Sequence, residues 1–149
     1  MRLLSVLTVS GLLLLTACSK SSSSSSSSKG TFTIGSASYT VNQIADSTSF
    51  LTASEAGGNT VIFYFKAGST PTSGTYDVVE TANATNQVSI SAVTYASGSF
   101  KFYDSGDSSS VKATVTINGN TKTIALPQVQ CTNSFNSTDK LMVSANITK

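Results

Sequence analysis

The chain has 149 residues, with nine Lys and Arg, seven Asp and Glu, and no His. Without histidine, every mechanism that uses imidazole as a general base or metal ligand is excluded. The lysines are scattered and form no basic patch interleaved with aromatic residues, so nucleic acid is not an expected partner. The length predicts one domain, and a surface rich in Ser, Thr, Asn and Gly is typical of exported β-proteins.

Residues 1–17 have the composition of a signal peptide. Arg2 supplies a positive charge, and an uncharged run dominated by Leu and Val follows over residues 3–15. This run is too short for the roughly 20 apolar residues of a membrane-spanning helix, and small residues follow it, as in export signals. Removal of the signal peptide takes Arg2 away and leaves eight basic against seven acidic side chains.

The end of this segment carries a specific motif, Leu15-Thr16-Ala17-Cys18. It resembles the lipobox of bacterial lipoproteins, in which a Leu and two small residues precede an obligatory cysteine. The resemblance implies cleavage between Ala17 and Cys18 and transfer of a diacylglycerol to the Cys18 thiol. A membrane would be the chain's partner through this covalent lipid, and we predict no cofactor and no metal. The alternative is an ordinary signal peptide with a chance cysteine.

Residues 18–30 are predicted to be the lipidated cysteine followed by a disordered linker. Eight consecutive serines lie within this segment, which has nothing apolar to bury. Twelve residues of such coil span roughly 20 Å on average. If Cys18 carries lipid, Cys131 has no partner in the chain, and we predict that it is a buried small hydrophobe. A reactive thiol or an intermolecular bridge is the alternative.

Residues 31–149 are predicted to form an all-β domain. Apolar and polar residues alternate with a period of two, which is the pattern of half-buried strands. No stretch of this part shows a helical stripe. Nine or ten short strands at regular spacing predict a single antiparallel β-sandwich, with a small lipocalin-like barrel as the alternative. The clearest alternating runs are residues 61–65, 100–103, 111–117 and 141–147.

Turn chemistry makes the pairing more specific. The alternation over 111–117 requires Ile124 and Leu126 to share its face, which demands a two- or four-residue loop. Asn118-Gly119, the favoured pair of a type I′ turn, satisfies this, as does Gly119-Asn120. Pro127 is expected to end the following strand, because proline cannot donate to a ladder.

Two further expectations concern a β-bulge and the last strand. Val88 and Ile90 lie on one parity and Val93 and Tyr95 on the other, so we predict a β-bulge near Ala92. The run that ends the chain is expected to be integral to the sheet.

Short motifs in the domain resemble those of small uncharacterised lipoproteins common in Bacteroidetes. They are strand starts after a polar tether, Thr31–Ile34 and Tyr39–Val41, a Gly-Thr-Tyr at 74–76 and a Gly-Ser-Phe-Lys-Phe at 98–102. The resemblance implies a small β-sandwich and brings no known activity, so it assigns no functional residue.

Candidate binding residues are few. Aromatic stacking is the natural binding chemistry of a β-domain, and since Trp is absent the candidates are Tyr39, Tyr64, Tyr95 and Tyr103. A carrier of an apolar ligand would instead line a cavity with inward-facing Phe63, Phe65, Phe100 and Phe102. A hydrolase would need to cluster Asp46, Asp77, Asp104 and Asp107.

We therefore predict a non-enzymatic lipoprotein of the cell envelope, with no catalytic residue. Its role would be structural or that of an accessory module binding a glycan or an envelope protein. The alternative is the small barrel carrier. Ser19 follows the cysteine in place of the Asp that often retains lipoproteins at the inner membrane, and Ser19-Lys20-Ser21 lacks the acidic surface-export tag. The outer membrane is therefore the expected location, with the periplasmic face favoured over the cell surface.

Overall fold

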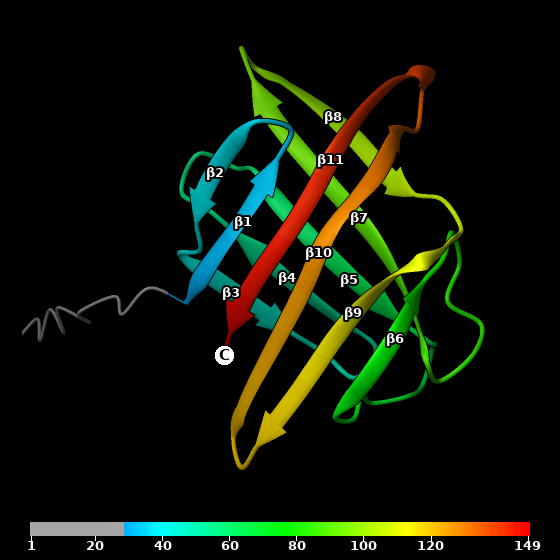
Figure 1. Ribbon diagram of the computed structural model, residues 1–149. Coiled ribbons are helices and arrows are strands. Elements are labelled where there is room, and N and C mark those ends of the chain that lie inside the picture. Colours follow the sequence, from blue (N-terminus) through cyan, green and yellow to red (C-terminus); the bar gives the residue numbers. More distant parts are fainter. Residues whose placement is uncertain (1–28) are drawn as a thin grey trace, which may run out of the picture.

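The computed structural model describes residues 29–149, which form eleven β-strands and no helix (Figure 1). The signal peptide, the cleavage site at Ala17 and Cys18, and nearly all of the predicted linker lie outside the described residues. No helix within the described part is long and apolar enough to cross a membrane. The strands are β1 (Gly30–Ile34), β2 (Ala37–Thr40), β3 (Gln43–Asp46), β4 (Phe50–Ser54), β5 (Thr60–Phe65), β6 (Gly74–Val78), β7 (Gln87–Ala96), β8 (Ser99–Ser105), β9 (Ser108–Asn118), β10 (Thr121–Asn133) and β11 (Asn136–Thr148).

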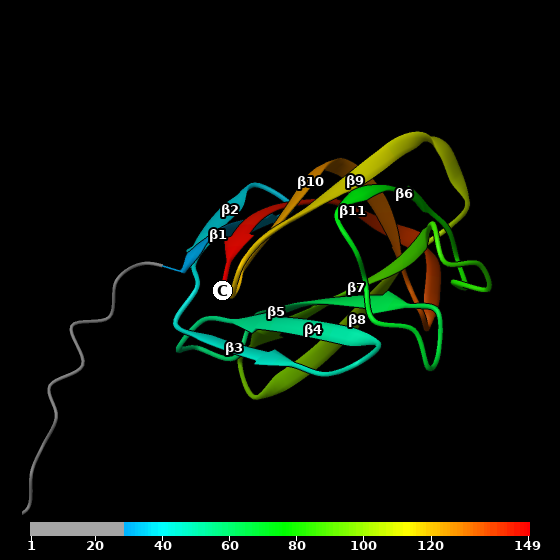
Figure 2. The ribbon, with the colours of Figure 1, turned by 90° about the horizontal axis from the view of Figure 1, so that it is seen from below.

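All eleven strands belong to one sheet in the order β2-β1-β11-β10-β9-β6-β7-β5-β4-β3, with β8 pairing both β10 and β7. The strands β10, β9, β6, β7 and β8 therefore close a five-stranded barrel. Two three-stranded wings extend from it, β11-β1-β2 and β5-β4-β3, and Figure 2 shows them as two facing layers. The all-β class is confirmed. In place of the predicted antiparallel sandwich there is a small barrel with wings, and its β6–β7 pair is parallel.

The core fills the barrel and the space between the wings. Alternate residues of nearly every strand point inward, and the largest side chains that are fully buried include Phe32, Phe63, Leu51, Ile90 and Ile124. At roughly 25 cal/mol per Å² of apolar surface removed from water, this burial is the main force that holds the sheet closed. The predicted inward sets at 111–117 and 141–147 are confirmed as buried or packed against the core.

Two predictions about β10 meet different outcomes. The hairpin before it has two loop residues, Gly119 and Asn120, since Asn118 pairs with Thr121. Gly119 takes the positive φ of 59° that the first position of a type II′ turn requires, so the Asn118-Gly119 type I′ turn is wrong and its alternative is right. Pro127 does not end the strand, which continues to residue 133 through a register shift between Leu126 and Val129.

The last strand is integral to the sheet, as predicted. β11 pairs with β10 on one side and with β1 on the other, from Gly30 opposite Ile147 to Ile34 opposite Val143. The first and last described strands therefore lie side by side, and the backbone N–H of Thr148 donates to the carbonyl of Lys29 at 2.9 Å.

An ion-pair cluster joins the two wings. Asp46, at the end of β3, accepts hydrogen bonds from the Nζ atoms of Lys122 at 3.0 Å and Lys149 at 2.9 Å. The side chains of Asp46 and Lys122 are only 14% and 13% exposed. Burial raises the pKa of the Asp46 carboxyl, but the hydrogen bonds from Lys149 and Lys122 and their charges outweigh it, so the pKa lies below the ordinary 3.8.

We expect Asp46→Asn to lower the free energy of unfolding by about 1–3 kcal/mol at neutral pH, as for other hydrogen bonds to charged groups. Because the folded-state pKa is depressed, this contribution is present above pH 3.8 and is lost as the pH falls through the lowered value. Urea unfolding across that range measures both effects. The matched control is Asp77→Asn, whose ion pair with Lys112 is far more exposed and should matter by at most about 1 kcal/mol. Equal losses in the two variants would contradict this role for Asp46.

Candidate functional site: an outward aromatic face

Large apolar side chains gather on the outer surface of the layer formed by β4, β5, β7 and β8. Within residues 29–149, five of the six large hydrophobic side chains that are exposed come from β4, β5, β7 and β8. No described strand covers the outer side of this layer in Figure 2. We call this surface the aromatic face; its members are Phe50, Tyr64, Tyr95, Phe100 and Phe102, which are 38–58% exposed.

Strand alternation produces this face. In β7 the buried set is Val88, Ile90 and Ala92, and the strand pairs with β5 and β8 without a register shift. The bulge predicted near Ala92 is therefore wrong. The apolar residues at 93 and 95 lie on the other parity because their side chains face outward. This change of parity was the one signal in the sequence that pointed to the aromatic face. The register then sets Tyr95 opposite Phe100 and Val93 opposite Phe102.

Tyr95 and Phe100 pack against each other at one end of the face. Their ring centroids lie 4.7 Å apart with planes tilted by 40°, a favourable aromatic arrangement. The backbone N–H of Tyr95 donates to the Oδ1 of Asn59 at 2.9 Å. Gly58 adopts a φ of 99°, and a Cβ there would lie 3.5 Å from the Cβ of Tyr95. The 55–59 loop therefore lies directly against the tyrosine.

A carboxylate orders that loop. Glu55 accepts hydrogen bonds from the backbone N–H groups of Gly57 and Asn59 and from the Asn59 side-chain amide. These bonds, led by the one from Gly57, lower the pKa of the Glu55 carboxyl below 4.5. The chain of contacts from Glu55 through Asn59 therefore holds the backbone of Tyr95 in place.

Polar groups cross the face next to the rings. One cross-strand row runs through Ile62, Ser91, Asp104, Thr132 and Lys140. The Asp104 carboxylate accepts hydrogen bonds from the hydroxyls of Ser91 and Ser134. It also lines a groove of about 450 Å³ together with Glu80, Ser105, Gly106, Thr132, Asn133 and Ser134.

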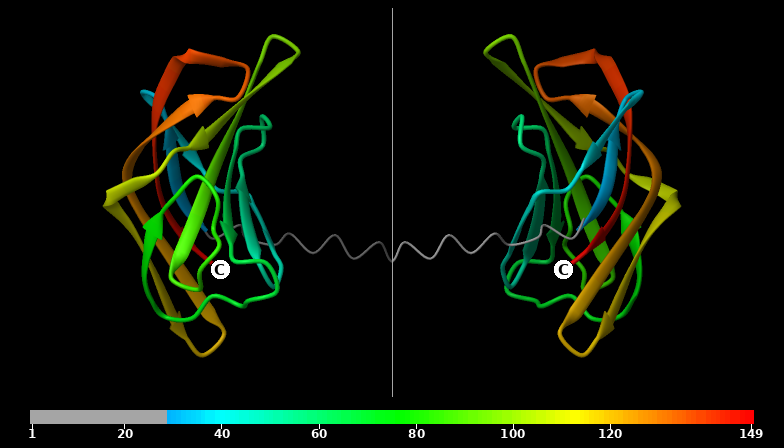
Figure 3. Two further views of the ribbon diagram at one scale, coloured as in Figure 1. Left: turned by 90° about the vertical axis from the view of Figure 1, so that its right-hand side faces the viewer. Right: turned by 90° about the vertical axis from the view of Figure 1, so that its left-hand side faces the viewer.

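The sixth exposed ring lies close to this groove. Phe135, in the two-residue turn between β10 and β11, is 86% exposed. Its neighbour Ser134 donates its backbone N–H to the carbonyl of Phe102 at 2.9 Å, so this hairpin tip lies against β8. Figure 3 shows the β7–β8 and β10–β11 hairpins at the same end of the domain.

The four predicted tyrosines do not form one site. Tyr64 and Tyr95 are on the aromatic face, each 41% exposed. Tyr39 instead lies on the other wing, β11-β1-β2, where its ring stacks on that of Phe32 with centroids 5.2 Å apart. Tyr103 is buried, and its hydroxyl donates to Asp139 at 3.1 Å. Phe50 and Phe135 were in neither predicted set, and Phe100 and Phe102 were predicted only as inward-facing residues of a carrier. Sequence alternation alone does not say which face of a strand is outside.

The phenylalanines predicted for a carrier do not converge either. Phe63 and Phe65 are buried in the core, whereas Phe100 and Phe102 are 58% and 43% exposed on the outer surface. These two pairs lie on opposite sides of the sheet, so they cannot line one cavity.

The four aspartates considered for hydrolysis are dispersed. Asp77 and Asp107 line one groove of about 360 Å³, where Asp77 forms an ion pair with Lys112 and Asp107 accepts from the backbone of Glu80. Asp46 lies between its two lysines and Asp104 on the aromatic face. Among residues 29–149, no three acidic or cysteine side chains gather as a metal site would require.

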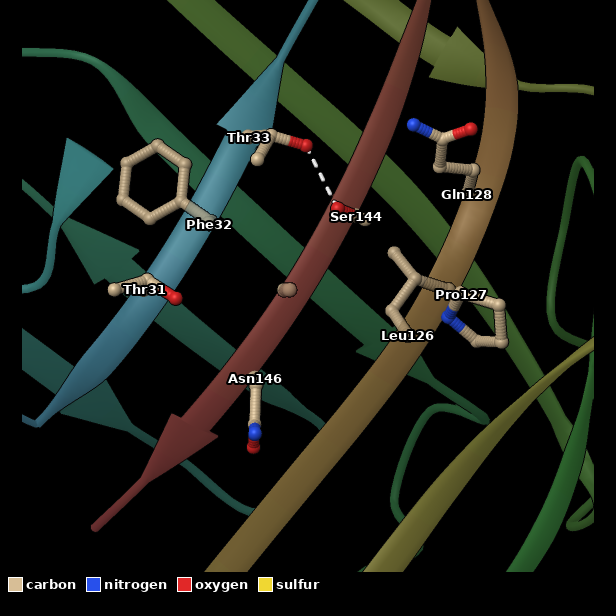
Figure 4. A pocket seen from close by; sticks show the side chains of 9 residues that line it. Thr31, Phe32, Thr33, Leu126, Pro127, Gln128, Ser144 and Asn146 are labelled. Carbon is tan, nitrogen blue, oxygen red and sulfur yellow. Dashed lines mark hydrogen bonds between the residues drawn. The ribbon is translucent and has the colours of Figure 1, made fainter. Parts of the chain in front are cut away.

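Another groove, of about 380 Å³, lies over β1, β11 and β10 on the opposite wing (Figure 4). The bulge at Pro127 and Gln128 shapes its rim, and the hydroxyls of Thr33 and Ser144 are 2.7 Å apart within it. Its aromatic residue, Phe32, is buried to 1% exposure, so the groove has no open ring on which a ligand could stack.

No protein family, no curated protein and no solved structure matches this chain significantly. The assignment of a site therefore depends on the geometry described above.

We expect the aromatic face to contribute little to folding. Phe100→Ala should change the free energy of unfolding by about 1 kcal/mol or less, as surface changes do. Phe63→Ala, at a fully buried position, should cost about 3–5 kcal/mol. Urea unfolding of both variants measures the difference. A loss at Phe100 as large as that at Phe63 would show that the ring is needed for stability.

Proposed function

We propose that this chain is a lipoprotein of the cell envelope, anchored through lipid on Cys18, whose β-domain is a non-catalytic binding module. The observation that carries the anchor is the motif Leu15-Thr16-Ala17-Cys18 after a short apolar run. The periplasmic side of the outer membrane is the favoured location, given Ser19 after the cysteine. The fold that presents the binding surface is the small barrel with its two wings.

The state of the other cysteine supports this proposal. Cys131 is fully buried and unpaired. Burial, and to a smaller extent the charge of Asp104, raises the pKa of its thiol to about 12. A thiol that is both inaccessible and protonated is a poor nucleophile, so of the chain's two cysteines Cys18 is the one suited to modification.

The position of β1 also supports the proposal. The first described strand begins at Gly30, next to the end of β11, so a tether over residues 19–30 would join the domain at one end. The aromatic face is the surface we assign to binding, because it combines open rings, hydroxyl groups and an adjoining groove.

The anchor is tested by expressing the whole chain with Cys18→Ala in a bacterium. The intact protein should incorporate a clickable fatty acid and fractionate with membranes, whereas the variant should incorporate none and become soluble. Cys131→Ala is the matched control and should behave like the unaltered chain. Membrane retention of the Cys18→Ala variant would refute anchoring by lipid at this residue.

A further inference from the structure

We infer that the aromatic face binds an uncharged, extended glycan. This inference deepens the proposed binding role and depends on it; only its argument against a lipid ligand uses the proposed anchor. Three features of the described residues lead to it: the spacing of the rings, the charge of the rows between them, and the place where the domain is joined to its tether.

The rings form two groups along the sheet. At one end are Tyr95, Phe100 and Phe102, and at the other Tyr64 is the cross-strand partner of Phe50. Tyr64 also pairs with Ser89 of β7, four residues from Val93, the partner of Phe102, and six from Tyr95. The groups are therefore about 13–20 Å apart at the rise of a β-strand. Two stacking platforms at that separation suit an extended ligand. The C–H groups of a sugar ring pack well on the electron-rich faces of such rings.

Hydroxyl groups lie in the interval between the platforms, beside the apolar side chains of Ile62 and Val93. Thr60 and Ser54 continue the row that contains Phe102 and Val93, and Thr52 continues the row that contains Ser91. Hydroxyls both donate and accept hydrogen bonds, which matches the hydroxyls of a sugar.

The charge of the face favours a neutral ligand. The row through β7, β8, β10 and β11 contains one carboxylate, Asp104, and one ammonium group, Lys140, so its formal charges cancel. The groove that adjoins this row adds the carboxylate of Glu80. Asp104 already accepts hydrogen bonds from two serine hydroxyls, and its oxygens have further lone pairs for sugar hydroxyls. The Asp104 carboxylate would repel a polyanion, and the row has no net charge that would attract a strongly charged partner.

The position of the face argues against a lipid surface as the ligand. β11 has thirteen residues and so is about 40 Å long at ordinary strand rise. Gly30, where the tether joins, lies opposite Ile147 near one end of β11, whereas Phe135 and the Ser134–Phe102 contact lie at the other end (Figure 1, Figure 3). The Tyr95–Phe100 end of the face is therefore the end of the domain farther from Gly30, where the proposed anchor would join.

The test uses the full chain carrying Cys18→Ala, which keeps the aromatic face and removes the anchor from the assay. Affinity gel electrophoresis and calorimetry would measure its binding to a panel of neutral polysaccharides: β-1,4-glucan, β-1,3-glucan, mannan and dextran. Polygalacturonate serves as the charged comparison, and vesicles of phosphatidylethanolamine and phosphatidylglycerol as the lipid comparison. We expect binding to at least one neutral glycan and none to polygalacturonate or vesicles.

Variants then locate the binding surface. Tyr95→Ala and Phe100→Ala should each weaken binding about fivefold or more, the effect of removing a central contact residue. Asp104→Asn should weaken it as well. Tyr39→Ala on the opposite wing and Asp77→Asn in the other groove are the matched controls and should leave affinity unchanged. Circular dichroism of each variant separates lost binding from lost folding.

Several outcomes would overturn the inference. A folded chain that binds no neutral glycan of the panel would do so, as would glycan affinity that Tyr95→Ala and Phe100→Ala leave unaltered. Vesicle binding or dimerisation abolished by Phe100→Ala would assign the face to lipid or to a second copy of the chain. None of these results bears on fatty-acid incorporation at Cys18, so the failure of glycan binding and the failure of lipid anchoring can be told apart.

Discussion

The rest of this structure depends on a change of partner along one edge of β10. Residues 121–125 of β10 pair with β9, and residues 131–133 pair with β8. Between them lie Pro127, which has no N–H to donate, and the register shift between Leu126 and Val129. A bulge bends a strand and increases its local twist, so β10 can leave one neighbour and take another. That change closes the barrel and leaves the remaining strands as wings.

The aromatic face is a direct consequence of this closure. β8 is held between β7 and β10, and its Tyr103 and Ser105 fill the inside of the barrel. The Ser105 hydroxyl accepts from the N–H of Ile90 and donates to the carbonyl of Val79, both at 2.9 Å, which satisfies a buried polar group. Because the odd-numbered side chains of β8 point into the barrel, the even-numbered Phe100 and Phe102 point outward. Exposed rings of this kind add little to stability and are informative about binding.

Anchor and face divide the chain into two parts with different physical roles. In the proposed role, the N-terminal motif would act through covalent chemistry at Cys18 and would need no folded domain, whereas the face needs the closed barrel and the loop held by Glu55. The two wings, joined by Asp46 and its lysines, connect the tethered end to the face.

The sequence by itself determined the all-β class, the strand that ends the chain and the inward sets of β9 and β11, because one apolar parity there alternates with polar residues. It also carries the whole case for the proposed lipidation, since residues 15–18 lie outside the described structure. It did not determine the barrel, the course of β10 past Pro127 or the outward direction of Phe100 and Tyr95. In β7 and β8 both parities hold apolar residues, so alternation cannot say which side is inside. Only the pairing of β8 with both β7 and β10 decides that, because the barrel interior accepts one parity and leaves the other in solvent.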